Sequence, residues 1–279
     1  MTSSTTIAKK NPQTIEEFFE ENAERFPPLL GNTIAPDKFL QLCTGAFRTA
    51  PKLRECTLVS LVDCMVGCAV LGLEPNTAKQ ESFLIPYAGK ATLVIGYQGW
   101  ITLASRAGME VVCVDVIRKG DTYHISRGTD PGIQHDIDLE AKRGDVLAAY
   151  CVIALPSGRL FNRVVMKKEL DAVRDKALSQ SRQNDTPWRQ YEEAMQLKTA
   201  IIRGVKHVPK FGDHRLAVAL ASEDAIEVGR PFSYGDGLDL ATPAAGGRRP
   251  RIAAPRSEGA FPIGDGDEVA PQGDPDALL

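Results

Sequence analysis

The 279-residue sequence contains no run of eighteen apolar residues, so it predicts no transmembrane helix. Its N-terminal segment also lacks the apolar core of a signal peptide, and these two absences predict a soluble, cytoplasmic protein. The motifs GxxxxGK[ST], GxSxG and HExxH are missing as well. The sequence therefore gives no support to a P-loop ATPase, an α/β-hydrolase or a zinc metalloprotease.

Cysteine pairs of the CxxC type are absent, although the sequence has six cysteines. Cys64 and Cys68 lie four residues apart on a predicted helix, a spacing at which two thiolates could touch one metal ion. No histidine or second cysteine pair lies nearby to complete such a site, and all six cysteines fall within apolar segments. We therefore expect reduced thiols in the core.

A strong net charge of either sign is also absent, because 33 Lys and Arg residues are balanced by 36 Asp and Glu residues. The charge is unevenly distributed, however. Residues 73–215 carry 21 basic and 17 acidic side chains, whereas residues 216–279 carry 5 and 11. A basic body with an acidic tail can bind a polyanion despite an isoelectric point of about 5.9.

The helix and strand signals that are present predict an α+β fold, with mostly antiparallel small sheets packed with helices. The predicted helices cover residues 14–24, 36–47, 57–71, 97–107, 167–178, 186–208 and 213–226, and the predicted strands lie within residues 81–95, 110–117, 121–126, 146–155 and 159–166. Residues 127–144 are predicted to form a polar loop. Thr186 followed by Pro187 is typical of a helix start.

The composition predicts three segments along the chain. Residues 1–29 are expected to form a mobile N-terminal arm with one short helix, and residues 30–228 one globular domain. Residues 229–279 are expected to form a disordered acidic tail. In that tail 16 of 51 residues are Gly or Pro and few are apolar, so burial cannot offset the entropy of ordering.

A predicted hairpin that leads into a helix lies at the centre of the sequence. The apolar period changes from that of a strand to that of a helix at Tyr97. Tyr97 and Trp100 could stack on nucleic-acid bases, with Lys90, Arg106 and Lys119 near hairpin or helix ends to contact phosphates. Aromatic side chains at such a junction also commonly belong to the core, and single cations are commonly ordinary surface charges. The sequence leaves both interpretations open.

The helix predicted for residues 186–208 carries basic side chains close to its apolar arc. Arg203 and Lys206 lie beside the arc and project together, and Lys210 would extend the same edge if the helix continued. Lys198 falls inside the arc, where it must meet a carboxylate or line a groove filled by an anion. A solvated basic edge with a salt bridge is the alternative interpretation.

Metal-capable side chains are concentrated in the strand 121–126 and the loop that follows it. These residues are Asp121, His124, His135, Asp136 and Asp138. Such oxygen and nitrogen donors could serve a metal-dependent nuclease. Their spacing matches no ligand motif, and a polar loop naturally carries such residues, so catalysis is the weaker hypothesis.

Several sequence blocks follow one another in a fixed order. They are Leu71-Gly-Leu-Glu-Pro75, Leu84-Ile-Pro-Tyr87, Ile95-Gly-Tyr-Gln-Gly99, Leu103-Ala-Ser-Arg-Ala-Gly108 and Thr186-Pro-Trp188, and then Met195, Lys198, Arg203, Lys206 and Pro209. Together they resemble the signature blocks of the RecT family of phage single-strand annealing recombinases. The likeness spans roughly residues 55 to 215, and several ordered blocks are far more specific than one short motif.

The resemblance implies ATP-independent binding of single-stranded DNA and annealing of complementary strands in phage-type homologous recombination, by a protein that is not an enzyme. The basic residues Lys198, Arg203 and Lys206 resemble those that contact DNA in RecT proteins. The resemblance also implies assembly into rings or filaments and a shared RecT-like annealing core. We expect no required cofactor, with Mg²⁺ as an optional aid, and partners that include the annealed duplex, a phage exonuclease and a host single-strand-binding protein. The alternatives are a non-annealing single-stranded DNA-binding protein and, less favoured, a metal-dependent nuclease.

Overall fold

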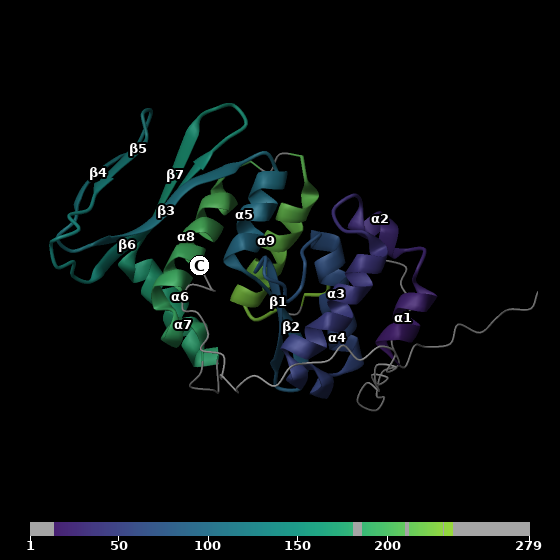
Figure 1. Ribbon diagram of the computed structural model, residues 1–279. Coiled ribbons are helices and arrows are strands. Elements are labelled where there is room, and N and C mark those ends of the chain that lie inside the picture. The colour runs from purple at the N-terminus through teal and green to yellow at the C-terminus, as the bar shows by residue number, and fades with distance from the viewer. Residues whose placement is uncertain (1–13, 181–185, 210–211, 231, 237–279) are drawn as a thin grey trace, which may run out of the picture. The chain divides into compact units, whose positions relative to one another are not determined.

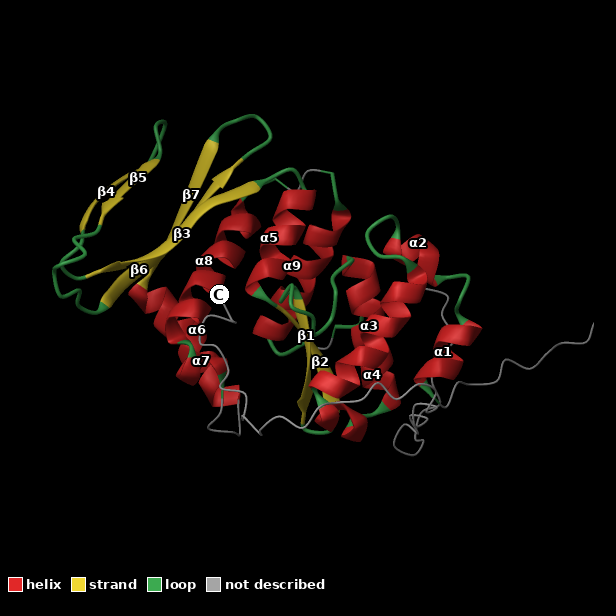
Figure 2. Ribbon diagram, in the orientation of Figure 1, coloured by secondary structure: helices red, strands yellow, loops and turns green. Residues whose placement is uncertain are grey.

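The computed structural model describes residues 14–180, 186–209, 212–230 and 232–236. These residues form helices and small antiparallel sheets (Figure 1 and Figure 2), which confirms the predicted α+β class. The chain divides into two compact units, where the sequence predicted one domain. Unit 1 contains the described residues of 14–78, 82–94 and 233–236, and unit 2 contains those of 79–81 and 95–232. Within these residues, none of the helices is both long and apolar enough to cross a bilayer.

Unit 1 is built from helices and one β-hairpin. Its elements are α1 (Ile15–Glu21), α2 (Phe26–Leu30), α3 (Pro36–Thr49), the 3₁₀ helix η1 (Pro51–Glu55), α4 (Leu58–Leu71), β1 (Ser82–Tyr87) and β2 (Lys90–Ile95), of which the last residue, Ile95, belongs to unit 2. Helix α4 follows Thr57, whose hydroxyl accepts the N–H of Ser60, and is followed by Gly72 in the left-handed conformation. Most α4 side chains are buried, because the helix is apolar around nearly its whole circumference.

The N-terminal arm predicted for residues 1–29 differs from the structure over residues 14–29. Residues 1–13 lie outside the described part, but α1 and α2 bury their aromatic side chains in unit 1. The ring centroids of Phe18 and Phe26 are 5.9 Å apart, and those of Phe19 and Phe39 of α3 are 6.1 Å apart. The prediction of mobility does not hold here, because burying several phenylalanine rings outweighs the entropy of ordering a short segment.

Residues 233–236 pack onto α4, and we call them the α4 strap. The Ser233 hydroxyl donates to Asp63 Oδ1 over 2.7 Å, and the Tyr234 N–H donates to the same oxygen over 3.1 Å. The Tyr234 ring lies over Gly67, where an added Cβ would come within 2.7 Å of it. The disorder predicted from residue 229 is therefore wrong for the strap, and residues 237–279 of the predicted tail lie outside the described residues.

We expect a chain that ends at Gly229 to melt at a lower temperature than one that ends at Asp236. The shorter chain loses both donors to Asp63 and uncovers the surface at Gly67, at a cost of about 2–4 kcal/mol. In a protein of this size, each kcal/mol corresponds to roughly 2–4 °C in melting temperature. Thermal unfolding followed by circular dichroism compares both chains with the full-length protein. Equal melting temperatures would show that the strap does not stabilise unit 1.

Unit 2 combines a three-stranded sheet, a separate two-stranded hairpin and five helices among its described residues. Its elements are α5 (Tyr97–Arg106), β3 (Glu110–Arg118), β4 (Thr122–Ser126), β5 (Gly132–Asp136), β6 (Val146–Ala154), β7 (Leu160–Met166), α6 (Lys167–Gln180), α7 (Pro187–Gln190), α8 (Glu192–His207) and α9 (His214–Glu227). The sheet has the antiparallel order β3–β6–β7, and β4 pairs with β5. Strand β5 was predicted as part of a polar loop, because only Ile133 and His135 alternate inward along it.

The two faces of the three-stranded sheet have different neighbours (Figure 2). One face packs closely against α8 at Gly204. A Cβ added to this glycine would lie 3.0 Å from Ile153 Cδ1 and 3.5 Å from Cys151 Cβ of β6. The opposite face carries a second apolar cluster, formed by Ile117, Ala148, Tyr150 and Val164 and packed by Ile125, Ile133 and Val152. Strand β6 is thus buried on both sides, which explains its nearly continuous apolar sequence.

The long helix predicted for residues 186–208 is divided in the structure. Helix α7 ends at Gln190, and Tyr191 adopts φ −135° and ψ 55° before α8 begins. Thr186 has the extended backbone of an N-cap residue, but its buried hydroxyl has no hydrogen-bond partner in the described residues. The helical period is continuous through this segment, so the break is a tertiary feature that periodicity does not predict.

All six cysteines are free thiols. Five of them are buried, as predicted, and burial raises the pKa of Cys68 to about 12. Cys113 is the exception, because it lies exposed on β3 with its Sγ 3.7 Å from the Tyr150 hydroxyl.

Candidate nucleic-acid interface

Helix α5 begins where two segments of unit 2 come into close contact. The N–H of Gly96 donates to the carbonyl oxygen of Glu81 over 2.9 Å. A Cβ built on Gly99 would lie only 2.0 Å from that same oxygen and 2.9 Å from Ile95 Cγ2. Position 99 therefore accepts only glycine, since a carbon atom and a backbone oxygen that are not bonded to each other do not approach this closely. Close backbone packing thus explains the spacing of the two glycines without any ligand.

The two aromatic side chains at this junction have different surroundings. Trp100 is fully buried, with 0% of its surface exposed, whereas Tyr97 is half-buried. The hypothesis that Trp100 stacks on a base has no exposed ring face to support it, because packing around α5 covers the indole. Burial raises the pKa of Tyr97, and the thiols of Cys151 and Cys113 add to the shift. Of the pair, Tyr97 is the side chain that keeps a surface for stacking.

The cations predicted near the hairpins are distributed over both units. Lys90 is exposed at the start of β2 in unit 1, and Lys119 is exposed after β3 in unit 2. Neither ammonium group forms an ion pair with a described residue. Arg106 is half-buried on α5, where burial lowers the pKa of its guanidinium and Glu81 opposes the shift. Lys210 lies outside the described residues.

Acidic side chains of α9 pair with the basic edge of α8. Arg203 Nη2 lies 2.7 Å from Glu227 Oε1, and Lys206 Nζ lies 3.3 Å from Glu227 Oε2. The same ammonium group also pairs with Asp224 Oδ1. Burial acts to raise the pKa of Glu227, but the hydrogen bond and charge of Arg203 and the charge of Lys206 outweigh it and lower the pKa. The sequence left two interpretations of Arg203 and Lys206 open, a DNA contact or a basic edge with a salt bridge. The structure contains the salt bridges.

These ion pairs are partly exposed, which limits their strength. The side chains of Arg203 and Lys206 are 25% and 15% exposed, and those of Glu227 and Asp224 are 36% and 57% exposed. Pairs at the surface contribute at most about 1 kcal/mol, since water and salt screen them. The pairing is therefore weak enough for a polyanion to break.

Lys198 has a different environment on the same helix. It is half-buried, and the charge that acts on it most strongly is that of Glu223 on α9. Burial lowers the pKa of Lys198, while Glu223 opposes the shift. Its ammonium group has no hydrogen bond or ion pair among the described residues. Of the two environments expected for Lys198, a nearby carboxylate or a groove filled by an anion, the structure contains a nearby carboxylate, and Glu223 acts on Lys198 through its charge.

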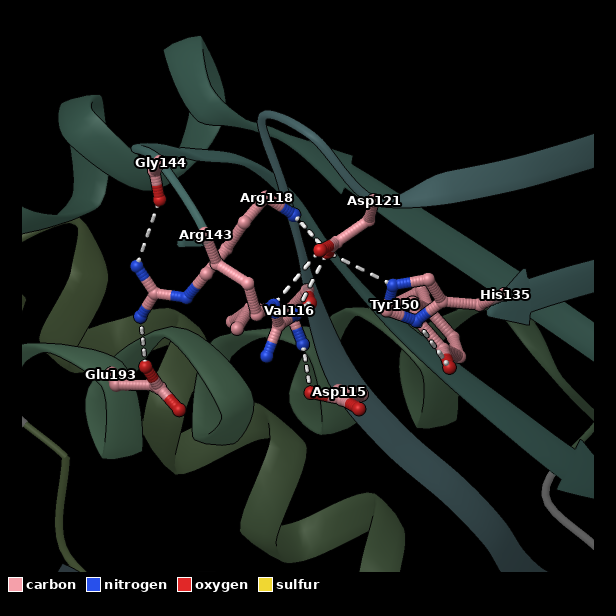
Figure 3. Close-up of polar contacts among 9 residues, drawn as sticks. All are labelled: Asp115, Val116, Arg118, Asp121, His135, Arg143, Gly144, Tyr150 and Glu193. Atoms are coloured by element: carbon pink, nitrogen blue, oxygen red, sulfur yellow. Dashed lines mark hydrogen bonds and ion pairs between the residues drawn. The ribbon is translucent and has the colours of Figure 1, made fainter. Parts of the chain in front are cut away.

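A buried polar network fixes the β4–β5 hairpin to the sheet of unit 2 (Figure 3). The Asp121 carboxylate, 1% exposed, accepts from Arg143 Nε over 2.8 Å and Nη2 over 2.7 Å, and from the Arg118 N–H over 2.7 Å. His135 Nε2 lies 3.0 Å from Asp121 Oδ2, and its Nδ1 lies 3.3 Å from the Tyr150 hydroxyl. The hydrogen bonds from Arg143, acting against burial, hold the pKa of Asp121 well below its usual range.

This network replaces the metal cluster that was considered for the same residues. In the β4–β5 register Tyr123 is paired with His135, so His124 points to the opposite face of the hairpin from His135. Asp136 and Asp138 are exposed. Across the described part of the chain, no group of three or more His, Cys, Asp or Glu side chains could hold a metal ion. The described geometry gives no support to the metal-nuclease hypothesis.

Several cations of unit 2 are more accessible than Arg203 and Lys206. They are exposed, and their side chains form no ion pair or hydrogen bond within the described residues: Lys119, Arg127, Lys142, Arg159, Lys168, Lys176 and Arg189. We call these seven residues the unpaired cations. Lys119 was among the predicted contacts, but most of the others were visible in the sequence only as part of a basic composition. Their lack of carboxylate partners is a tertiary property.

Comparison with known proteins defines the class. A model of the RecT family matches residues 37–229, which is well over half of the chain. The chain therefore belongs to the RecT family, a family of DNA recombination and annealing proteins, and the resemblance seen in the sequence blocks is confirmed. The matched range contains every described candidate contact, from Lys90 to Lys206.

Two relatives show how far the similarity extends. Protein RecT of Escherichia coli (strain K12) is 29% identical over 214 residues, which cover 74% of this chain and 78% of that protein. Uncharacterized protein YqaK of Bacillus subtilis (strain 168) is 24% identical over 180 residues, which cover 64% of this chain and 60% of that protein. Both matches cover more than half of each chain, so the similarity is not confined to one short motif.

Proposed function

We propose that this protein binds single-stranded DNA and anneals complementary strands, without ATP and without covalent chemistry, in homologous recombination of the phage type. The observation that carries the proposal is the RecT match over residues 37–229, because it takes in most of both units. The accessible surface is compatible with it, since the unpaired cations of unit 2 are exposed and form no ion pair with a described carboxylate.

Annealing requires positive charge along the DNA backbone and base edges that stay free. Two strands repel each other through their phosphates, and each cation that contacts a phosphate releases a counterion and reduces the repulsion. Tyr97 is the candidate for stacking on a base without regard to sequence. Base pairing then supplies the specificity and much of the driving free energy. No side chain has to form or break a covalent bond in this scheme.

The proposal also includes assembly and partners. Stable annealing holds many base pairs at once, and linking many weak sites raises the effective affinity steeply, so the chain should assemble with itself into rings or filaments. No cofactor is required, and Mg²⁺ helps only by screening phosphates. A phage exonuclease would supply the single strands, and a host single-strand-binding protein would compete for them.

We expect the protein to accelerate pairing of two labelled complementary oligonucleotides in EDTA and without ATP. The oligonucleotides are mixed at a concentration at which they pair slowly alone, and fluorescence transfer between the labels follows the reaction. A non-complementary pair is the control, because it can be bound but not annealed. Light scattering of the same mixtures reports assembly.

The same experiment separates the competing functions. Binding without faster pairing would identify a non-annealing single-stranded DNA-binding protein. Shortened strands that appear only when Mg²⁺ replaces EDTA would identify a nuclease. A protein that neither binds nor anneals the strands would refute the proposed function.

A further inference from the structure

The cations of α8 that resemble DNA contacts are already neutralised inside the protein. Arg203 and Lys206 pair with Glu227, and Lys206 also pairs with Asp224. We infer that these two carboxylates of α9 are an internal competitor of the DNA backbone, which nucleic acid must displace before it reaches the two cations. The inference rests on the proposed function and adds a regulated contact to it.

The geometry of Glu227 matches that of a phosphate group. Its Oε1 accepts from Arg203 over 2.7 Å, and its Oε2 accepts from Lys206 over 3.3 Å. One carboxylate thus bridges both cations with its two oxygens, as the two non-bridging oxygens of one phosphodiester would do. The basic edge is therefore arranged for a single anionic group of about this size.

The accessibility of the four side chains allows such an exchange. Glu227 and Asp224 are 36% and 57% exposed, whereas Arg203 and Lys206 are 25% and 15% exposed. The carboxylates therefore face solvent more than the cations do, and they can rotate away without crossing the core. Arg203 and Lys206 lie on α8 beside the buried residues Ile202 and Val205, so packing fixes the backbone that carries the two cations.

The position of the acids in α9 is unfavourable for the helix itself. Glu227 is the last residue of α9, Asp224 lies in its last turn, and no basic residue is present there. A negative charge at the C-terminus of a helix opposes the helix dipole. Glu227 and Asp224 are therefore stabilised by the α8 cations and not by their own helix. An anion that binds these cations more strongly can take their place.

Glu227→Gln tests the inference in the full-length protein. We expect it to bind a labelled oligo-dT strand about three- to tenfold more tightly than the wild type at low salt. The slope of log Kd against log salt should also increase by roughly 0.7 for each cation that loses its carboxylate partner. Such a cation neutralises a phosphate and releases the counterion bound there, with no carboxylate left to take up a counterion in exchange. Asp224→Asn, which removes a partner of Lys206 alone, should give a smaller gain.

The matched control is Glu169→Gln. Glu169 pairs with Arg163 over 3.0 Å and is 45% exposed, so its removal changes the net charge equally and releases Arg163, but leaves Arg203 and Lys206 paired. The double variant Arg203→Ala with Glu227→Gln should lose most of the gain. Thermal melting of each variant verifies that the fold is intact, and Asp224→Asn keeps the test valid should Glu227→Gln unfold.

The outcomes separate this inference from the proposed function. A gain in Glu227→Gln that is no larger than that in Glu169→Gln would overturn the competitor, even when the wild type anneals DNA. A gain that persists in the double variant would also overturn it. Binding of the strand by Glu227→Gln, with none by the wild type, would support the inference that Glu227 competes with DNA for the two cations. Absence of binding by all variants would overturn both proposals.

Discussion

We expect Gly99→Ala to lower the free energy of unfolding by about 3–5 kcal/mol, a large part of the stability of a typical domain. The added Cβ would lie 2.0 Å from the carbonyl oxygen of Glu81, and a backbone oxygen cannot rotate away as the end of a side chain can. Relief requires either the 79–81 segment or α5 to move, which breaks the 2.9 Å hydrogen bond from Gly96 to the same oxygen. Urea unfolding followed by circular dichroism measures the loss.

Gly45→Ala on α3 is the matched control for this variant. A Cβ at Gly45 has Arg48 Nη2, 3.9 Å away, as its nearest neighbour, which is ordinary contact. Alanine favours a helix over glycine by up to about 1 kcal/mol, so this variant should be neutral or stabilised. Equal destabilisation of the two variants would contradict the close-contact explanation of Gly99.

The second large effect is expected from Asp121→Asn, which should destabilise unit 2 by about 3–5 kcal/mol. The carboxylate is 1% exposed and accepts two hydrogen bonds from Arg143, so its loss leaves a guanidinium without its main partner (Figure 3). His135, 3% exposed, loses the acceptor for its Nε2 at the same time. Urea unfolding at pH 7 measures the difference from the wild type. Asp136→Asn is the control, because Asp136 is exposed on the same hairpin and should change stability by no more than about 0.5 kcal/mol.

The pH dependence of this difference has a defined sign. The pKa of Asp121 is lower in the folded protein than its usual value of 3.8, because Arg143 donates to the charged form. The stabilisation is therefore fully present above that value and is lost as the pH falls toward the folded pKa. The gap in unfolding free energy between wild type and Asp121→Asn should be constant near neutral pH and should shrink below about pH 4. A gap of equal size at pH 3 and pH 7 would argue against the ion pair.

The sequence located many helices because their signals come from residues close together in the chain. Thr57 and Asp213 both cap helices with their side chains, and Gly72 follows α4 in the left-handed conformation. The sequence also identified Arg203 and Lys206 as neighbours, since a helix with 3.6 residues per turn places residues three apart on one side. These features need no knowledge of the rest of the fold.

The partners of those cations could not be found in the same way. Helices α8 and α9 both pack against α5, and that packing brings Glu227 to Arg203 across 24 residues of sequence. The burial of Trp100 depends likewise on distant segments. An aromatic ring at a strand–helix junction has the same sequence signature whether it is covered or exposed.

The sequence by itself determined the α+β class, the RecT family and the positions of most helices and strands. The tertiary structure alone decided that Trp100 is covered, that His124 and His135 point to opposite faces, and that residues 233–236 return to α4. It also decided which cations of the described residues form ion pairs and which do not. The physical reason is that propensity, capping and periodicity act between residues a few positions apart, whereas burial and ion pairing depend on atoms of distant segments whose separation only packing fixes.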